Sequence, residues 1–101
     1  MPGKLTRDII MRRLSASKGN FRSLGVKRIA LFGSFARGDQ RKDSDVDVLV
    51  EFRKGMKTFD GYMDLKFFLE EIFGRNVDLV LKEAIKPGLK RDILDGAIYA
   101  A

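Results

Sequence analysis

Three short apolar runs, at residues 26–32, 45–52 and 77–81, constrain the fold of this 101-residue chain more than any other feature. Each run is five to eight residues long, which is the usual length of a strand. Residues 45–52 also alternate, with Val and Phe side chains on one face and Asp, Leu and Glu side chains on the other. A chain of this length buries one core, so we expect the three strands in one domain, residues 1–101.

Amphipathic segments flank these strands. Residues 60–73 carry apolar side chains at helical spacing and end at Gly74, and Pro87 opens a helix that is predicted to run to Ile98. The predicted buried face of this last helix consists of Leu89, Ile93, Leu94 and Ala97. Thr6 is a candidate cap for a helix near the N-terminus.

The predicted order is helix, strand, short helix, strand, helix, strand, helix. This order indicates an α/β fold with a small three-stranded mixed sheet flanked by helices. The link between the second and third strands holds a full helix, as a parallel pair requires. The shorter link between the first two strands allows an antiparallel pair.

Composition excludes several kinds of chemistry. The chain has no Cys and no His, which removes disulfides, thiolate or imidazole metal ligands and histidine bases. Any bound metal must therefore sit among oxygen ligands, as Mg²⁺, Mn²⁺ and Ca²⁺ do. The net charge of +6 attracts nucleotides, nucleic acid or an acidic protein without choosing among them. No apolar run approaches the roughly 20 residues that cross a membrane, and no apolar leader is visible, so we expect a cytoplasmic protein.

Three aspartates are the candidate metal ligands. Asp45 and Asp47 lie two residues apart on a strand, so their side chains share a face and repel each other unless a cation or proton lies between them. The alternative is that they are solvated residues at the strand entrance. Asp78 is the one charge in 77–81, and parallel strands would bring it to the same end of the sheet. Such a cluster can hold two divalent ions that promote in-line displacement at phosphorus.

Gly33 and Ser34 directly follow the first strand and precede the predicted short helix. Glycine lets the backbone approach a ligand closely, and the amides at a helix start attract phosphate. Arg37, three residues later, can contact phosphate or form a salt bridge to a nearby Asp. Ser44 is expected to orient the turn before Asp45. A Gly-Ser pair alone is also typical of an ordinary turn.

Taken together, these residues resemble the signature of the minimal nucleotidyltransferases, within the DNA polymerase β-like nucleotidyltransferase superfamily. The match comprises residues 33–38 (GSFARG), five intervening residues, and residues 44–48 (SDVDV). Val48 departs from the leucine that is common in the family, a change that concerns packing. The resemblance extends through essentially the whole chain and implies the nucleotidyltransferase fold.

The resemblance also implies roles for the candidate residues. Gly33 and Ser34 would hold the triphosphate of ATP, the implied substrate. Asp45 and Asp47 would bind Mg²⁺, with Mn²⁺ as an alternative. Asp78 matches the third carboxylate of the family, which would help to deprotonate the acceptor hydroxyl and complete the metal site.

Small stand-alone members of this family resemble antitoxins whose partner is a helical HEPN ribonuclease. The implied activity is transfer of AMP from ATP to a tyrosine of that toxin. Two alternatives stay open: a non-catalytic module that neutralises its partner by occlusion, and a transferase acting on RNA or a small molecule. The basic charge permits nucleic acid without favouring it, and the sequence leaves self-association open.

Overall fold

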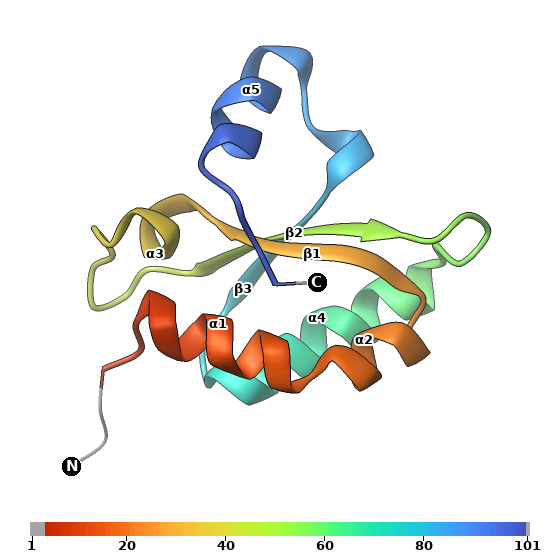
Figure 1. Cartoon of the computed structure of the whole chain (residues 1–101), viewed down its shortest axis with the longest axis horizontal. Coiled ribbons are helices and arrows are strands. Elements are labelled where there is room, and N and C mark those ends of the chain that lie inside the picture. The colour runs from red at the N-terminus through yellow and green to blue at the C-terminus, as the bar shows by residue number, and fades with distance from the viewer. Residues whose placement is uncertain (1–3, 101) are drawn as a thin grey trace.

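A four-stranded mixed sheet is the centre of this computed structural model, which describes residues 4–100 (Figure 1). The strands are β1 (Val26–Phe32), β2 (Val46–Phe52), β3 (Val77–Leu81) and β4 (Ile98–Tyr99), in the order β3-β2-β1-β4. β1 pairs antiparallel with β2 and β4, whereas β2 pairs parallel with β3. The predicted mixed sheet is confirmed, with one strand more than the sequence indicated.

Helices lie on both sides of this sheet. They are α1 (Arg7–Ala16), α2 (Lys18–Ser23), α3 (Gly33–Arg37), α4 (Phe59–Phe73) and α5 (Pro87–Asp95), with a 3₁₀ turn η1 (Lys82–Ala84). Figure 1 shows α1, α2 and α4 below the sheet and α5 standing on the opposite side. The Thr6 hydroxyl accepts a hydrogen bond from the Ile9 amide at 3.3 Å, so the predicted cap of α1 is confirmed. No helix in residues 4–100 is long and apolar enough to cross a bilayer.

The core lies between the sheet and the three helices below it. Val46, Val48 and Val50 of β2 are fully buried in it, as the alternation predicts. α1 and α4 supply Ile10, Leu14, Leu65 and Leu69, which are also fully buried. The opposite face of β2 carries Asp47 and Glu51, both half-buried. One face of the sheet is therefore used for stability, and the other carries polar chemistry.

The C-terminal segment differs from the prediction. α5 ends at Asp95, and Ile98 with Tyr99 forms the short edge strand β4 instead of a last helical turn. The predicted buried helix face was also wrong, since no α5 side chain is buried and Leu89 is 55% exposed. The open edge of β1 offers backbone partners that a free helix end lacks, and the Ala100 amide donates to the Ile29 carbonyl at 3.0 Å.

The contrast between the buried core and the exposed helix α5 predicts that two Leu→Ala substitutions destabilise the protein to different extents. Leu65→Ala should lower the free energy of unfolding by about 2–5 kcal/mol, because it leaves a cavity in the core. Leu89→Ala on α5 should change it by less than about 0.5 kcal/mol. Urea unfolding followed by circular dichroism measures both values, and equal losses would contradict the exposed position of α5.

Candidate active site

Asp47 and Asp78 are the centre of the candidate site. They are register partners in the parallel pair of β2 and β3, so their side chains leave the sheet next to each other. The pKa of Asp47 is raised from 3.8 to about 6, first by burial and then by the negative charges of Asp78 and Asp45. Arg37 acts in the opposite direction. Asp78, Asp45 and Arg37, the other three charged residues predicted from sequence, therefore lie within electrostatic reach of Asp47.

Gly33 lies directly against this carboxylate. It is the first residue of α3 and has a φ of +73°, in the left-handed region that favours glycine. A Cβ built on Gly33 would collide with the Asp47 side chain, with the carboxyl carbon only 2.8 Å away. Ser34 follows in the first turn of α3 and is half-buried. The start of the Gly-Ser turn thus adjoins the Asp47 carboxylate.

Arg37 is available at the edge of the site. Its Nε donates to the Asp39 carboxylate at 3.1 Å, which is the salt bridge that the sequence left as an alternative to phosphate contact. Both side chains are more than half exposed, so this ion pair adds little stability. Arg37 can therefore exchange Asp39 for a phosphate at small energetic cost.

The carboxylates suit a hard divalent cation, although they are not a preformed cage. Among residues 4–100, no three His, Cys, Asp or Glu side chains are gathered closely enough to hold a metal ion. Asp45 precedes the first paired residue of β2 and is exposed, so strand pairing does not fix its side chain. The donors are nevertheless all carboxylate oxygens. Burial first, and then the charges of Asp78 and Asp45, raise the pKa of Asp47, and a bound cation would offset this cost of its negative charge.

Arg75 is a residue of this region that the sequence did not reveal. Its Nη1 donates to the carbonyls of Lys42 at 2.8 Å and Ser44 at 2.9 Å, directly before Asp45. Its guanidinium also lies over the Phe35 ring of α3, 5.4 Å from the centroid. Arg75 therefore ties together the start of β3, the loop that leads to Asp45 and the helix that begins at Gly33.

Arg75→Gln should loosen the loop before Asp45. Loss of two hydrogen bonds from a charged donor should speed amide hydrogen exchange of residues 43–46 by about tenfold or more. The Ser44 hydroxyl, which accepts from the Arg41 amide at 2.7 Å as predicted for this turn, remains in the variant. Arg53→Gln, in an exposed loop, serves as the charge-matched control. Unchanged exchange in Arg75→Gln would show that Arg75 does not hold the loop.

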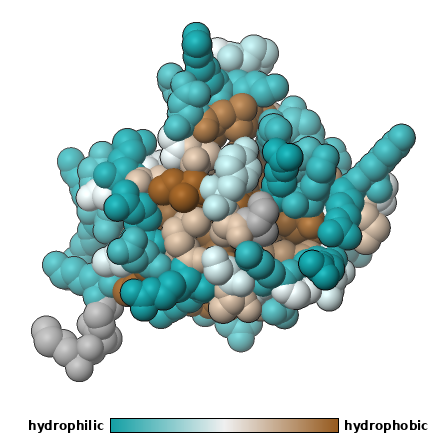
Figure 2. Space-filling model, in the orientation of Figure 1, coloured by the Kyte–Doolittle hydropathy of each residue, from teal (hydrophilic) through white to brown (hydrophobic). Residues whose placement is uncertain are grey.

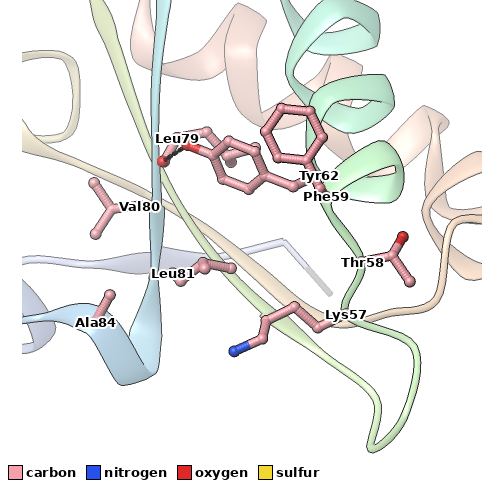
Figure 3. A pocket seen from close by; sticks show the side chains of 8 residues that line it. All are labelled: Lys57, Thr58, Phe59, Tyr62, Leu79, Val80, Leu81 and Ala84. Carbon is pink, nitrogen blue, oxygen red and sulfur yellow. Dashed lines mark hydrogen bonds between the residues drawn. The ribbon is translucent and has the colours of Figure 1, made fainter.

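A separate apolar pocket of about 510 Å³ lies at the outer edge of β3 (Figure 3). Its lining comes from the start of α4, from β3 and from η1, and includes Phe59, Tyr62 and Val80. The Tyr62 hydroxyl donates to the Leu79 carbonyl at 2.6 Å, which fixes the ring at the pocket wall. None of the six candidate site residues lines this pocket. The carboxylates instead lie on the open face of the sheet.

Comparison with known proteins places this geometry in a family. The chain matches the model of the nucleotidyltransferase domain over residues 14–100. The chain belongs to the nucleotidyltransferase domain family. This confirms the resemblance carried by residues 33–38 and 44–48, and it makes the protein a nucleotidyltransferase enzyme.

Individual relatives agree with this nucleotidyltransferase assignment. The protein adenylyltransferase MntA of Thermococcus cleftensis is 38% identical over 96 residues, covering 94% of this chain and 96% of the relative. A solved structure described as a candidate minimal nucleotidyltransferase is 34% identical, with a TM-score of 0.82, covering 96% of this chain and 98% of the other. A complex of a tri-AMPylated Shewanella oneidensis HEPN toxin with an MNT antitoxin matches with a TM-score of 0.63 at 17% identity, covering 90% of this chain and 71% of the other. At that identity, the last match shows the fold alone.

Proposed function

We propose that this nucleotidyltransferase moves AMP from ATP onto a tyrosine hydroxyl of a HEPN toxin and thereby acts as its antitoxin. The observation that carries the proposal is Asp47, which lies beside Asp78 and against Gly33. This contact supports a site in which the carboxylates that would bind metal adjoin the turn that would bind a triphosphate. The name of the MntA relative and the AMPylated toxin in the Shewanella complex support AMP as the group and a HEPN protein as the acceptor.

The proposed site assigns each residue a task. Gly33 and Ser34 bind the triphosphate, Arg37 contacts phosphate, and Asp45, Asp47 and Asp78 hold two Mg²⁺ ions, or Mn²⁺. Bound metal would neutralise the charge that develops on the phosphate oxygens. The acceptor oxygen forms a bond to the α-phosphorus of ATP. The bond between that phosphorus and the oxygen that bridges the α- and β-phosphates breaks, and pyrophosphate leaves. The carboxylate of Asp78 takes up the hydroxyl proton and releases it to water.

The remaining proposals concern the chain as a whole. We infer that residues 1–101 form a single domain; residues 1–3 and 101 lie outside the described residues. We place the reaction in the cytoplasm, where ATP is available. Self-association is compatible with this proposal but is not required by it.

Transfer of label from ATP tests the proposed activity. The folded protein, Mg²⁺, ATP labelled at the α-phosphate and a HEPN protein from the same genome should give a protein labelled on tyrosine. Absence of label from intact, folded proteins would reject the proposal. Label in added RNA, and not in the HEPN protein, would favour the RNA transferase.

A double variant distinguishes AMP transfer from the alternative, in which the protein neutralises its partner by occlusion alone. Asp45→Ala/Asp47→Ala should lose the ability to neutralise the toxin if chemistry carries the function. Neutralisation that survives unchanged, while label transfer is lost, would show that binding alone is sufficient. Co-purification of the variant with its partner checks that the complex still forms.

A further inference from the structure

A second pocket adjoins the loop that leads to Asp45. It encloses about 470 Å³, which lies within the size range of small-molecule sites. It is lined by Lys4, Leu5, Phe35, Gln40, Arg41, Lys42 and Arg75. Four of these seven residues are cations, and none is acidic. None of the six candidate site residues lines this pocket.

The cations of this pocket lack counter-ions. Within residues 4–100, none of the four lies within 4.0 Å of a carboxylate oxygen, although five ion pairs form elsewhere. Arg75 is half-buried, and only its Nη1 is used, on the carbonyls of Lys42 and Ser44. A guanidinium held in place with N–H groups to spare is prepared to bind an oxyanion by charge-assisted hydrogen bonds.

A polar atom in the same wall has no partner. The Gln40 side-chain oxygen is buried and accepts no hydrogen bond within the described residues. Buried polar atoms are nearly always hydrogen-bonded, so a donor group brought by a ligand would supply the partner that this oxygen lacks. Leu5 and Phe35 add apolar wall beside it. The pocket therefore combines cations for an anion, an acceptor for an O–H or N–H group, and apolar surface.

We propose that this pocket binds a small phosphate compound, with the phosphate on Arg41, Lys42 and Arg75 and a donor group of the ligand on Gln40. The shared chemistry is the phosphate oxyanion, whose source is either an inorganic phosphate or a nucleoside phosphate. The proposal does not depend on the acceptor of the transfer reaction, because none of the three aspartates lines the pocket. It adds a second phosphate site to the chain.

Calorimetry and NMR of the full chain in EDTA test this proposal, since the absence of divalent metal weakens binding at the carboxylates. Pyrophosphate and AMP are titrated separately. We expect one equivalent to bind and the side-chain signals of Gln40 and Arg75 to shift. Tighter binding of AMP than of pyrophosphate identifies a nucleoside phosphate as the source, because the apolar wall then contributes. Equal or weaker binding of AMP identifies an inorganic phosphate.

Two double variants distinguish phosphate binding in this pocket from unspecific attraction of phosphate to the basic surface. Arg41→Gln/Lys42→Gln should weaken binding at least about tenfold, as expected for lost charge-assisted hydrogen bonds. Arg53→Gln/Lys54→Gln removes the same charge from another exposed loop and should weaken binding less than about twofold. Equal weakening in both variants, unshifted Gln40 and Arg75 signals, or no binding at about 10 mM ligand would each overturn the proposal.

Discussion

Replacing Asp47 with asparagine is expected to abolish nucleotidyl transfer and, at the same time, to stabilise the metal-free protein. If Asp47 binds metal as proposed, its loss removes several kcal/mol of stabilisation from the transition state, so activity should fall by about a thousandfold or more. The stabilisation arises because burial and two neighbouring carboxylates disfavour the charged form of Asp47 in the fold. The same charge that would bind the metal therefore opposes folding when no metal is present.

The sign and the pH window of this effect follow from the raised pKa. The pKa of Asp47 is about 6 in the fold against an ordinary value of 3.8, so this carboxyl favours folding below pH 3.8, and that contribution is lost as the pH rises through 6. An uncharged asparagine side chain at this position has no such loss. The free energy of unfolding of Asp47→Asn should therefore exceed that of the native chain by about 1–2 kcal/mol at pH 7.5, after allowance for partial exposure.

Urea unfolding in EDTA at pH 4 and pH 7.5 measures this difference, which should be much smaller at pH 4. Asp64→Asn removes one negative charge from an exposed position on α4 and controls for the general charge of a basic protein. Added Mg²⁺ and ATP should stabilise the native chain and leave Asp47→Asn unaffected. A less stable Asp47→Asn protein at pH 7.5 would contradict the electrostatic account.

Gly33→Ala adds a single methyl group and should strongly impair nucleotidyl transfer. The left-handed backbone of Gly33 costs an L residue about 1–2 kcal/mol, and the new Cβ would also displace the Asp47 carboxylate. We expect transfer activity to fall by about a hundredfold, since small displacements of a reacting group have effects of this size.

Gly55→Ala separates these two causes. Gly55 has a similar φ of +79°, but nothing lies within 4 Å of a Cβ built there. The Gly55→Ala protein should lose about as much stability as Gly33→Ala but retain full transfer activity. Both proteins are compared by urea unfolding and by label transfer. Equal activity of the two variants would show that the contact between Gly33 and Asp47 has no functional weight.

The sequence was most informative where one signal dominated. Residues 26–32 and 77–81 match β1 and β3 because each is a short, mostly apolar run with clear ends. The proximity of Asp47 and Asp78 could be predicted because parallel pairing alone brings the starts of two strands to one end of a sheet. Asp45 was placed one residue too far into its strand, since pairing begins at Val46.

The sequence was least informative where distant backbone decides the structure. The two residues of β4 are too short to show a strand period, and their apolar side chains also fit the spacing of the preceding helix. Arg75 binds the carbonyls of residues 42 and 44, and no side-chain pattern encodes a hydrogen bond to a carbonyl so distant in the chain. The contact of Gly33 with Asp47 likewise depends on how β1 and β2 turn back on each other.

The arm formed by α5 and β4 has a consequence for how such proteins diverge. Figure 2 shows mostly hydrophilic surface around α5, with apolar residues gathered just below it. α5 contributes no side chain to the core, yet β4 anchors its end on Ala30 and Leu31. Mutations on this helix can therefore accumulate with little effect on folding. A lineage of duplicated genes can alter this surface independently in each copy, while the carboxylate face stays unchanged.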